Sequence, residues 1–146
     1  MKFVRFESGD GVAAYGVVNG DKVNEISNSP IGQDYSETGS TYDLQDIKIL
    51  APNPHPSKML CLALNYGSHL LGADKPTRPE PFYKNTNAII GPGDAIRLPA
   101  EAGLVVCESE LVAIIGREAS KVSEQDALEY VFGYTAGNDV SAREWQ

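Results

Sequence analysis

The fold of this chain is decided by one apolar stretch, Leu104-Val105-Val106-Cys107-Glu108-Ser109-Glu110-Leu111-Val112-Ala113-Ile114-Ile115, which Gly116 follows directly. It is apolar except at Glu108, Ser109 and Glu110, and Val, Ile and Leu dominate it. This composition predicts one long and mostly buried β-strand over residues 104–115. Side chains two residues apart on a strand share a face, with Cα atoms about 6.5 Å apart. Glu108 and Glu110 are therefore expected to project side by side.

Two carboxylates at the mouth of an apolar strand cannot both stay charged and dry without a counter-charge. Solvent, a basic side chain or a metal ion could each provide it, and oxygen ligands of this kind suit Mg²⁺, Mn²⁺ or Ca²⁺. Taken alone, Glu108 and Glu110 fit a solvated strand start better than a metal site. Asp139 is open to two interpretations: an N-cap of a final helix, or a third ligand at the same rim.

The segments around this strand predict further elements of a β-rich catalytic domain. Residues 58–64 form a continuous apolar run, the pattern of a strand covered on both faces. Ser123 is a natural N-cap for a helix over residues 124–132 that Gly133 closes. Four shorter elements are also expected: extended segments at 82–84, 95–98 and 134–136, and the start of a helix at 141–146.

The first 26 residues predict a small antiparallel meander with strands at 2–6, 13–18 and 22–26, and Asn19-Gly20 is a strong hairpin signal. Residues 27–43 are rich in Ser, Gly, Thr and Asp, which is typical of a surface connection.

Prolines at positions 52, 54 and 56 mark a domain boundary. We therefore expect a small β-rich domain with its linker at residues 1–50 and the front part of a catalytic domain at residues 51–146. Three strands bury little on their own, so the small domain must pack against the larger one.

Charge and composition exclude several classes of protein. The chain has 146 residues, with 12 basic against 20 acidic side chains and a formal charge of −8, which argues against a nucleic-acid partner. An acidic protein that handles anionic substrates needs a local positive charge, which a bound cation would supply. No apolar run approaches the roughly 20 residues needed to cross a bilayer, and the start lacks the apolar core of a signal peptide. Cys61 and Cys107 are expected to be buried, reduced thiols, and the cytoplasm is the expected location.

Three further polar residues are candidates for catalysis or substrate binding. His69 follows the predicted strand at 58–64 and precedes a stretch with Gly72, Pro76 and Pro79, which suits a loop or lid. A histidine there is well placed for general-base work, although an exposed loop histidine fits equally well. Lys84 could hold a substrate carboxylate, and so could Arg78. By residue type alone both are more simply solvated side chains.

Together these residues resemble the fumarylacetoacetate hydrolase family, metal-dependent enzymes that cleave, decarboxylate or isomerise 2-oxo and β-diketo acids. The resemblance covers residues 58–146 and rests on segments in the family's order and spacing: Leu64-Asn65-Tyr66-Gly67-Ser68-His69, Phe82-Tyr83-Lys84, Ile90-Gly91-Pro92-Gly93-Asp94, Glu108-Ser109-Glu110-Leu111, and Tyr130-Val131-Phe132-Gly133-Tyr134-Thr135-Ala136-Gly137-Asn138-Asp139-Val140-Ser141-Ala142-Arg143. The opening meander is similar to the small N-terminal domain of many members. The implied fold is α+β and β-rich, a mixed β-roll or sandwich preceded by a small β-meander domain.

The resemblance also implies a site. Glu108, Glu110 and Asp139 match the family's Mg²⁺ or Mn²⁺ ligands, and His69 matches its catalytic histidine on the lid. Lys84 and Gln146 resemble substrate-contacting positions. In the implied mechanism the metal chelates two oxygens of an oxo acid, His69 activates a water that attacks the adjacent carbonyl, and the cation stabilises the enolate that leaves.

The implied function is metal-dependent hydrolysis or lysis of C–C bonds in 2-oxo or β-diketo acids, by a cytoplasmic homodimer with a small-molecule oxo acid as its partner. One alternative is an isomerase or hydratase of unsaturated 2-oxo acids in aromatic catabolism. Another is a truncated, inactive metal-binding or dimerisation module.

The sequence departs from the family pattern at three points, of which the first and the last favour the inactive module. Gly72 stands where many members have a glutamate that orients the histidine. Val106-Cys107 replaces a frequent Asp-Tyr before the first ligand, and the family's catalytic domain normally continues beyond the last residue of this sequence.

Overall fold

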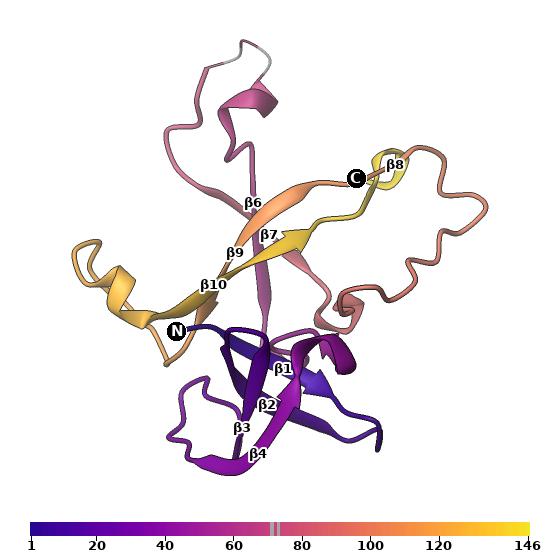
Figure 1. The fold of residues 1–146 in the computed structure, drawn as a ribbon. Helices are drawn as coiled ribbons and strands as arrows, with labels where there is room; N and C mark the ends of the chain where they lie inside the picture. Colours follow the sequence, from indigo (N-terminus) through magenta and orange to yellow (C-terminus); the bar gives the residue numbers. More distant parts are fainter. Residues whose placement is uncertain (71, 73) are drawn as a thin grey trace.

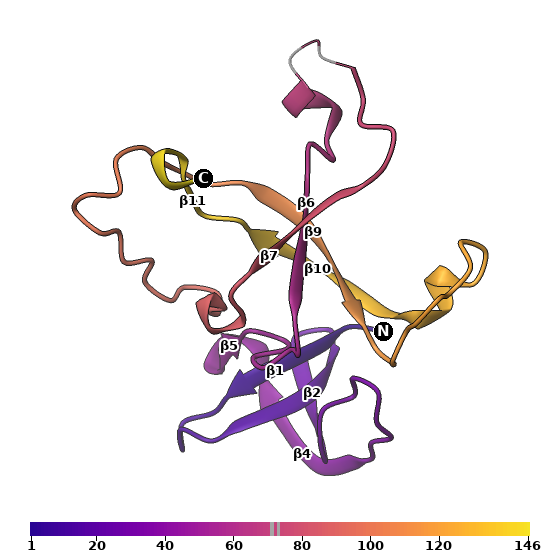
Figure 2. The same cartoon turned by 180° about the vertical axis from the view of Figure 1, so that it is seen from behind.

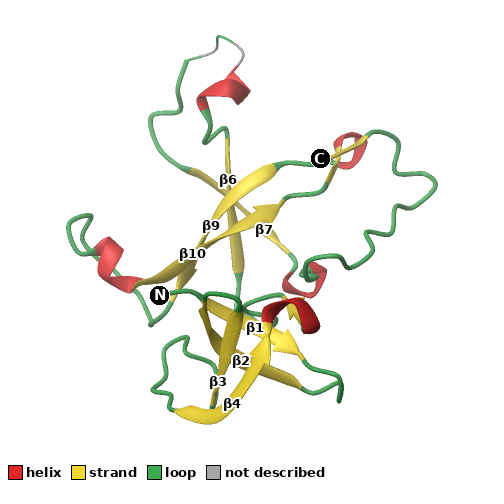
Figure 3. Cartoon of the chain, in the orientation of Figure 1, coloured by secondary structure: helices red, strands yellow, loops and turns green. Residues whose placement is uncertain are grey.

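The computed structural model describes residues 1–70, 72 and 74–146. Within these residues the chain is β-rich, with strands joined by loops and by single turns of 3₁₀ helix (Figure 3). This agrees with the α+β, β-rich fold that the sequence predicts. No helix in the described part of the chain is long and apolar enough to span a membrane.

The N-terminal part forms a five-stranded antiparallel sheet with the order β4-β3-β2-β1-β5 (Figure 1). Its strands are β1 (Phe3–Glu7), β2 (Ala13–Asn19), β3 (Lys22–Ile26), β4 (Glu37–Asp43) and β5 (Lys48–Leu50), and η1 (Leu44–Asp46) lies between the last two. The predicted meander is confirmed. Its hairpin turn is Gly20-Asp21, one residue later than expected, and Gly20 takes the positive φ of 62° that such a turn requires.

The small sheet has its own core, because Phe6 and Val23 are fully buried and Val4 packs with them. The interpretation of residues 27–43 as a surface connection is wrong for its last part, which is strand β4. The polar composition misled because β4 is an edge strand whose first five residues are exposed, and an edge strand tolerates polar side chains.

The remainder of the chain forms three two-stranded antiparallel pairs: β6 (Met59–Ala63) with β7 (Glu80–Lys84), β9 (Ser109–Ile115) with β10 (Val131–Asn138), and β8 (Val105–Val106) with β11 (Ser141–Ala142). Three short helical turns lie between these strands, η2 (Gly67–Leu70), η3 (Thr86–Ala88) and η4 (Ala127–Tyr130), and η5 (Arg143–Trp145) follows β11 in the described part of the chain. Figure 2 shows the β6–β7 and β9–β10 pairs crossing above the small sheet. The rings of Phe3 and Phe132, 5.3 Å apart, connect the two parts.

The predicted single strand over residues 104–115 is wrong, because the chain breaks at Cys107 and Glu108 and changes its pairing partner. β8 pairs with β11 and β9 pairs with β10. The break between β8 and β9 lies opposite Asp139 and Val140, the two residues between β10 and β11. Both strand segments therefore bend at the same point, and the three acidic residues lie around that bend.

The predicted helix over residues 124–132 is also wrong. The Ser123 hydroxyl accepts a hydrogen bond from the N–H of Asp126 at 3.2 Å, as an N-cap would, but only the single 3₁₀ turn η4 follows, and Asp126 is at its N-cap position. The β-branched and aromatic residues from Val131 onward extend β10 instead, and Gly133 lies at a register shift within it. The segment expected at 134–136 is part of this longer strand. Residues 95–98 form no strand, and 141–146 form β11 and η5 in place of an α-helix.

The prediction that residues 58–64 are covered on both faces is wrong in this chain. Leu60 and Leu62 of β6 are 53% and 46% exposed. Both thiols are free as expected, although Cys107 is exposed and Cys61 is half-buried.

Candidate functional site

The candidate site is built where β9 begins and β10 ends. Glu110 lies opposite Gly137 in the β9–β10 ladder. One step further, the backbone N–H of Asp139 donates to the carbonyl of Glu108 at 2.9 Å. The N–H of Glu108 donates to the Asn138 side-chain oxygen at 3.1 Å. The three predicted metal ligands therefore come from two hydrogen-bonded neighbouring segments.

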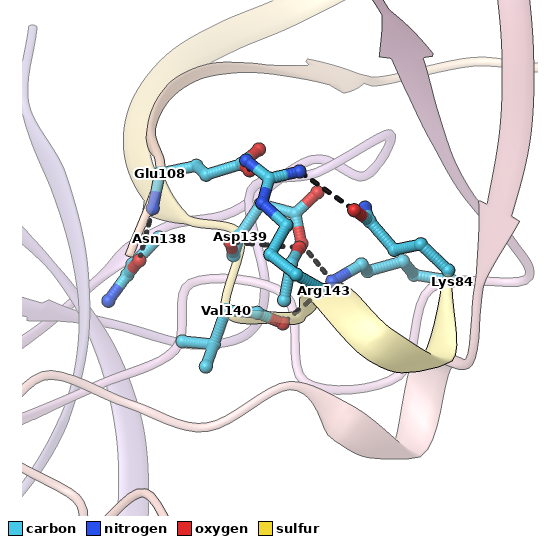
Figure 4. Close-up of polar contacts among 8 residues, drawn as sticks. Lys84, Glu108, Asn138, Asp139, Val140 and Arg143 are labelled. Carbon is cyan, nitrogen blue, oxygen red and sulfur yellow. Dashed lines mark hydrogen bonds and ion pairs between the residues drawn. The ribbon is translucent and has the colours of Figure 1, made fainter. Parts of the chain in front are cut away.

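Lys84, at the end of β7, reaches into this site from a third strand (Figure 4). Its ammonium forms an ion pair with Asp139 Oδ1 and donates to the carbonyl of Val140 at 3.0 Å. The Asp139 side chain is only 11% exposed and that of Lys84 is 27% exposed. A carboxylate that is withdrawn from water to this extent needs a counter-charge, and Lys84 provides it.

Arg143, the first residue of η5, provides a second positive charge (Figure 4). Its Nη2 lies 2.5 Å from Glu108 Oε1, with the side chains 45% and 16% exposed, respectively. Its Nη1 donates to the Gln146 side-chain oxygen at 2.7 Å. Gln146, predicted as a substrate contact, thus binds the guanidinium that neutralises Glu108.

The donor chemistry of the three acids fits a hard divalent cation, because carboxylate oxygens are its preferred ligands. Their side chains are not gathered as such a site, however. No group of three His, Cys, Asp or Glu side chains among the described residues is arranged to hold a metal ion. Two of the three carboxylates instead hold Lys84 and Arg143. A metal ion would need at least part of these ion pairs to be exchanged.

Cys61 is a neighbour of the site that the sequence does not point to. Burial raises the pKa of its thiol, and the charges of Asp139 and Glu110 raise it further, while Lys84 acts in the opposite direction. The thiol therefore lies within electrostatic reach of all three side chains. The pairing of β6 with β7 places Cys61 near Lys84. Cys61 lies two residues from Met59 on β6, and Met59 is the cross-strand partner of Lys84.

His69 lies in η2, on the loop that projects beyond β6 and β7 (Figures 1 and 2). Its imidazole is exposed, with its centroid 6.0 Å from that of the Tyr66 ring. The Tyr66 hydroxyl accepts a hydrogen bond from the N–H of Leu111 at 3.0 Å, which ties the base of the loop to β9 beside Glu110.

Arg78 is exposed on the same loop. Within the residues that the structure describes, no ion pair or hydrogen bond joins His69 or Arg78 to the three acids. Besides the predicted Lys84, two residues that the sequence does not single out contact this region: Arg143 pairs with Glu108, and Tyr66 binds the N–H of Leu111.

Two family models match this chain. Residues 58–146 match the C-terminal domain of fumarylacetoacetate (FAA) hydrolase, and residues 1–52 match a domain described as Rv2993c-like, N-terminal.

The similar curated proteins include eukaryotic ones. The chain is 50% identical over 105 residues to the fumarylacetoacetate hydrolase domain-containing protein 2 homolog of Dictyostelium discoideum, covering 70% of this chain and 34% of the relative. It is 43% identical over 103 residues to the mitochondrial oxaloacetate tautomerase fahd2 of Xenopus laevis, covering 69% and 32%. The matched part is thus about a third of each of these relatives.

Solved structures match over all or nearly all of the chain. The 5-carboxymethyl-2-hydroxymuconate delta-isomerase of Mycobacterium smegmatis aligns with a TM-score of 0.88 and 39% identity, covering 100% of this chain and 57% of that protein. The maleylpyruvate hydrolase of Sphingobium sp. SYK-6, in complex with manganese (II) ion and pyruvate, aligns with a TM-score of 0.73 and 26% identity, covering 96% and 58%.

Proposed function

Because this chain belongs to the fumarylacetoacetate hydrolase family, we propose that it carries the carboxylate side of a divalent-metal site at which a 2-oxo acid is isomerised or tautomerised. The observation that carries the proposal is the hydrogen-bonded junction between Glu108 and Asp139, with Glu110 beside it on β9. This junction supports the expected convergence of the three acids from two strand ends.

Glu108, Glu110 and Asp139 are the residues that would hold Mg²⁺, or Mn²⁺ or Ca²⁺ in its place. A bound divalent cation supplies polarisation of a carbonyl oxygen and stabilises the negative charge that develops on it. The manganese in the Sphingobium protein supports a metal of this type in a similar fold.

The chain's own side chains then have separate tasks. His69 moves the proton between carbon and oxygen when its loop lies over the substrate, which fits its position on a loop anchored through Tyr66. Lys84, Arg78 and Gln146 are proposed to contact the substrate carboxylates. Lys84 has the additional task of supplying the counter-charge to Asp139, whose side chain is 11% exposed.

The names of similar proteins favour an isomerase or tautomerase over the C–C hydrolysis that the resemblance first suggests. One similar protein is named an oxaloacetate tautomerase and another a 5-carboxymethyl-2-hydroxymuconate delta-isomerase. Both names describe a proton or double-bond shift without cleavage of the carbon chain. C–C hydrolysis is the second candidate, and the maleylpyruvate hydrolase supports it.

We also propose that the chain associates as a homodimer. One face of the β9–β10 hairpin exposes large apolar side chains: Leu111 at 69%, Ile115 at 53% and Tyr134 at 58%. Exposed apolar surface of this kind marks an association surface in soluble proteins. Light scattering measures the molecular mass of the chain and of a Tyr134→Glu variant, in which dimerisation should be weakened. If the unaltered chain keeps the mass of a monomer at high concentration, the homodimer proposal is contradicted.

The activity is tested by following the keto–enol equilibration of oxaloacetate in the ultraviolet, with Mg²⁺ and after chelation, and by a parallel assay for hydrolysis of an acylpyruvate. Glu108→Gln is expected to abolish the Mg²⁺-dependent rate. Glu118→Gln is the matched control, because it removes one exposed acid outside the site. A rate that is indifferent to Mg²⁺ and to Glu108→Gln contradicts the proposal.

A further inference from the structure

The two ion pairs of the candidate site differ in how firmly they are held. Lys84 is bound at two points, Asp139 and the carbonyl of Val140, and its side chain is 27% exposed. Arg143 is 45% exposed, and its guanidinium bridges Glu108 and the Gln146 side chain. The Arg143 pair is thus closer to solvent than the Lys84 pair.

The backbone of Arg143 is fixed while its side chain is exposed. Its N–H donates to the carbonyl of Leu104 at 2.9 Å, directly beyond the β8–β11 pairing. Rotation of the side chain alone therefore moves the guanidinium away from Glu108. No strand pair needs to open for this to happen.

The three acids also differ in how their carboxylates are paired. Asp139 contacts Lys84 through Oδ1, which leaves its second oxygen for another cation. Glu110 is in no ion pair within the part of the chain that the structure describes. Glu108 is the ligand whose carboxylate another positive group occupies and can release.

We propose that Arg143 is an internal competitor for the divalent cation: it occupies Glu108 in the metal-free protein, is displaced when the cation binds, and so sets the cation affinity of the site. This inference rests on the proposed function, because it uses the same three acids.

The size of the effect follows from the exposure of the pair. Half-exposed ion pairs contribute modestly, which corresponds to about a three- to tenfold change in an equilibrium constant. Arg143→Gln is therefore expected to tighten Mn²⁺ binding by about that factor. Arg143→Lys keeps the charge but loses the planar fork of the guanidinium. The Mn²⁺ affinity of this variant is expected to lie between that of the unaltered chain and that of Arg143→Gln.

Arg117→Gln is the matched control. Arg117 also pairs with a glutamate, Glu129, at the surface, with side chains 53% and 71% exposed. The Arg117→Gln substitution removes the same charge from the molecule as Arg143→Gln does. Any general gain in cation attraction therefore appears in both variants. Only the excess gain of Arg143→Gln measures the local competition.

The experiment is a Mn²⁺ titration of the 146-residue chain and its variants, read by electron paramagnetic resonance at fixed ionic strength. The proposal is supported if Arg143→Gln binds about three- to tenfold more tightly than the Arg117→Gln control. It is overturned if the two variants bind equally while Glu108→Gln abolishes binding; the metal site then stands without the competitor. If Glu108→Gln and Asp139→Asn leave Mn²⁺ binding unchanged, or no variant binds Mn²⁺, the site itself is wrong and the competitor with it.

A second readout needs no substitution. The guanidinium nitrogen resonances of Arg143 are followed by NMR while Mg²⁺ is added to the unaltered chain, with Arg117 as the internal reference. Displacement predicts that the Arg143 signals move in step with saturation of the site while those of Arg117 stay in place. Saturable Mg²⁺ binding with static Arg143 signals overturns the proposal.

Discussion

The ion pair between Lys84 and Asp139 is expected to stabilise the fold far more than an exposed pair of the same residue types. We propose a double-mutant cycle with Lys84→Met, Asp139→Asn and the double variant. The chain contains its own control, because Lys22 and Asp43, cross-strand partners in β3 and β4, form a second lysine–aspartate pair, at 2.7 Å. The two pairs differ chiefly in exposure: 27% and 11% for the first pair, against 48% and 40% for the second.

The magnitudes follow from this difference. Removing one partner of a fully buried pair costs about 3–5 kcal/mol, so a pair as partly exposed as Lys84–Asp139 should lose about 2–3 kcal/mol. Loss of the hydrogen bond to the Val140 carbonyl accounts for about 1 kcal/mol of that when Lys84 is replaced. We expect a coupling energy of about 1–2 kcal/mol for this pair. For Lys22 and Asp43 we expect about 0.5 kcal/mol or less.

The assay is urea unfolding followed by circular dichroism, in a buffer with chelator so that bound metal does not alter the free energy of unfolding. The same cycles are repeated at high salt, which should reduce the coupling of the exposed pair more than that of the half-buried pair. Equal coupling energies in the two cycles would refute the reasoning. Burial would then not be what makes the Lys84 contact important.

Three further predictions concern the rest of the chain. Phe6→Ala should destabilise the chain by about 3–4 kcal/mol in urea unfolding, because Phe6 is fully buried in the small sheet, and a loss under about 1 kcal/mol would contradict that core. Lys48 lowers the pKa of Asp94, so the stability from this pair is present above the ordinary carboxyl pKa and is lost as the pH falls through the lowered one. In an NMR titration Lys48→Met should return the pKa of Asp94 toward its usual value, and an unchanged titration curve would exclude the contact as the cause. Tyr66→Phe should accelerate amide hydrogen exchange at Leu111, which loses its acceptor, and unchanged exchange would mean that the loop is not anchored there.

The sequence predicts those strands that depend on local pattern. The β2–β3 hairpin follows from Asn19-Gly20 and its alternating flanks, and β6 follows from one short apolar run. Both signals lie within a few residues of the element that they predict. The error at residues 124–132 has the opposite cause. The turn that Ser123 makes with the N–H of Asp126 indicates where a helix can start, but pairing with β9 decides where the chain becomes extended.

The acidic residues of the candidate site are predictable as a group, whereas their partners are not. The segments of Glu108 and Asp139 meet because β9 and β10 are neighbours, which a strand-end argument anticipates. Arg143 and Lys84 reach the site from elements whose pairing cannot be read from sequence: η5 lies beyond β11, and Lys84 ends β7. The sequence predicts too much burial of residues 58–64 for a related reason. An apolar run reports that a segment can be covered, and Leu60 and Leu62 are nevertheless exposed on β6 in this chain.

Repulsion among neighbouring carboxylates can be relieved by groups other than a metal ion. Three carboxylates that meet at one bend require positive charge, and Lys84 and Arg143 supply two such charges from within the chain. Converging acids therefore do not by themselves distinguish a metal site from an internal ion-pair network. The distinction lies in whether the internal cation can leave. Lys84 is tied to a backbone carbonyl as well as to Asp139, so it behaves as part of the fold, while Arg143 is close to water and can exchange Glu108 for a competing ion. A site with one fixed and one exchangeable cation stays folded when it is empty and can still bind a divalent ion when one is present.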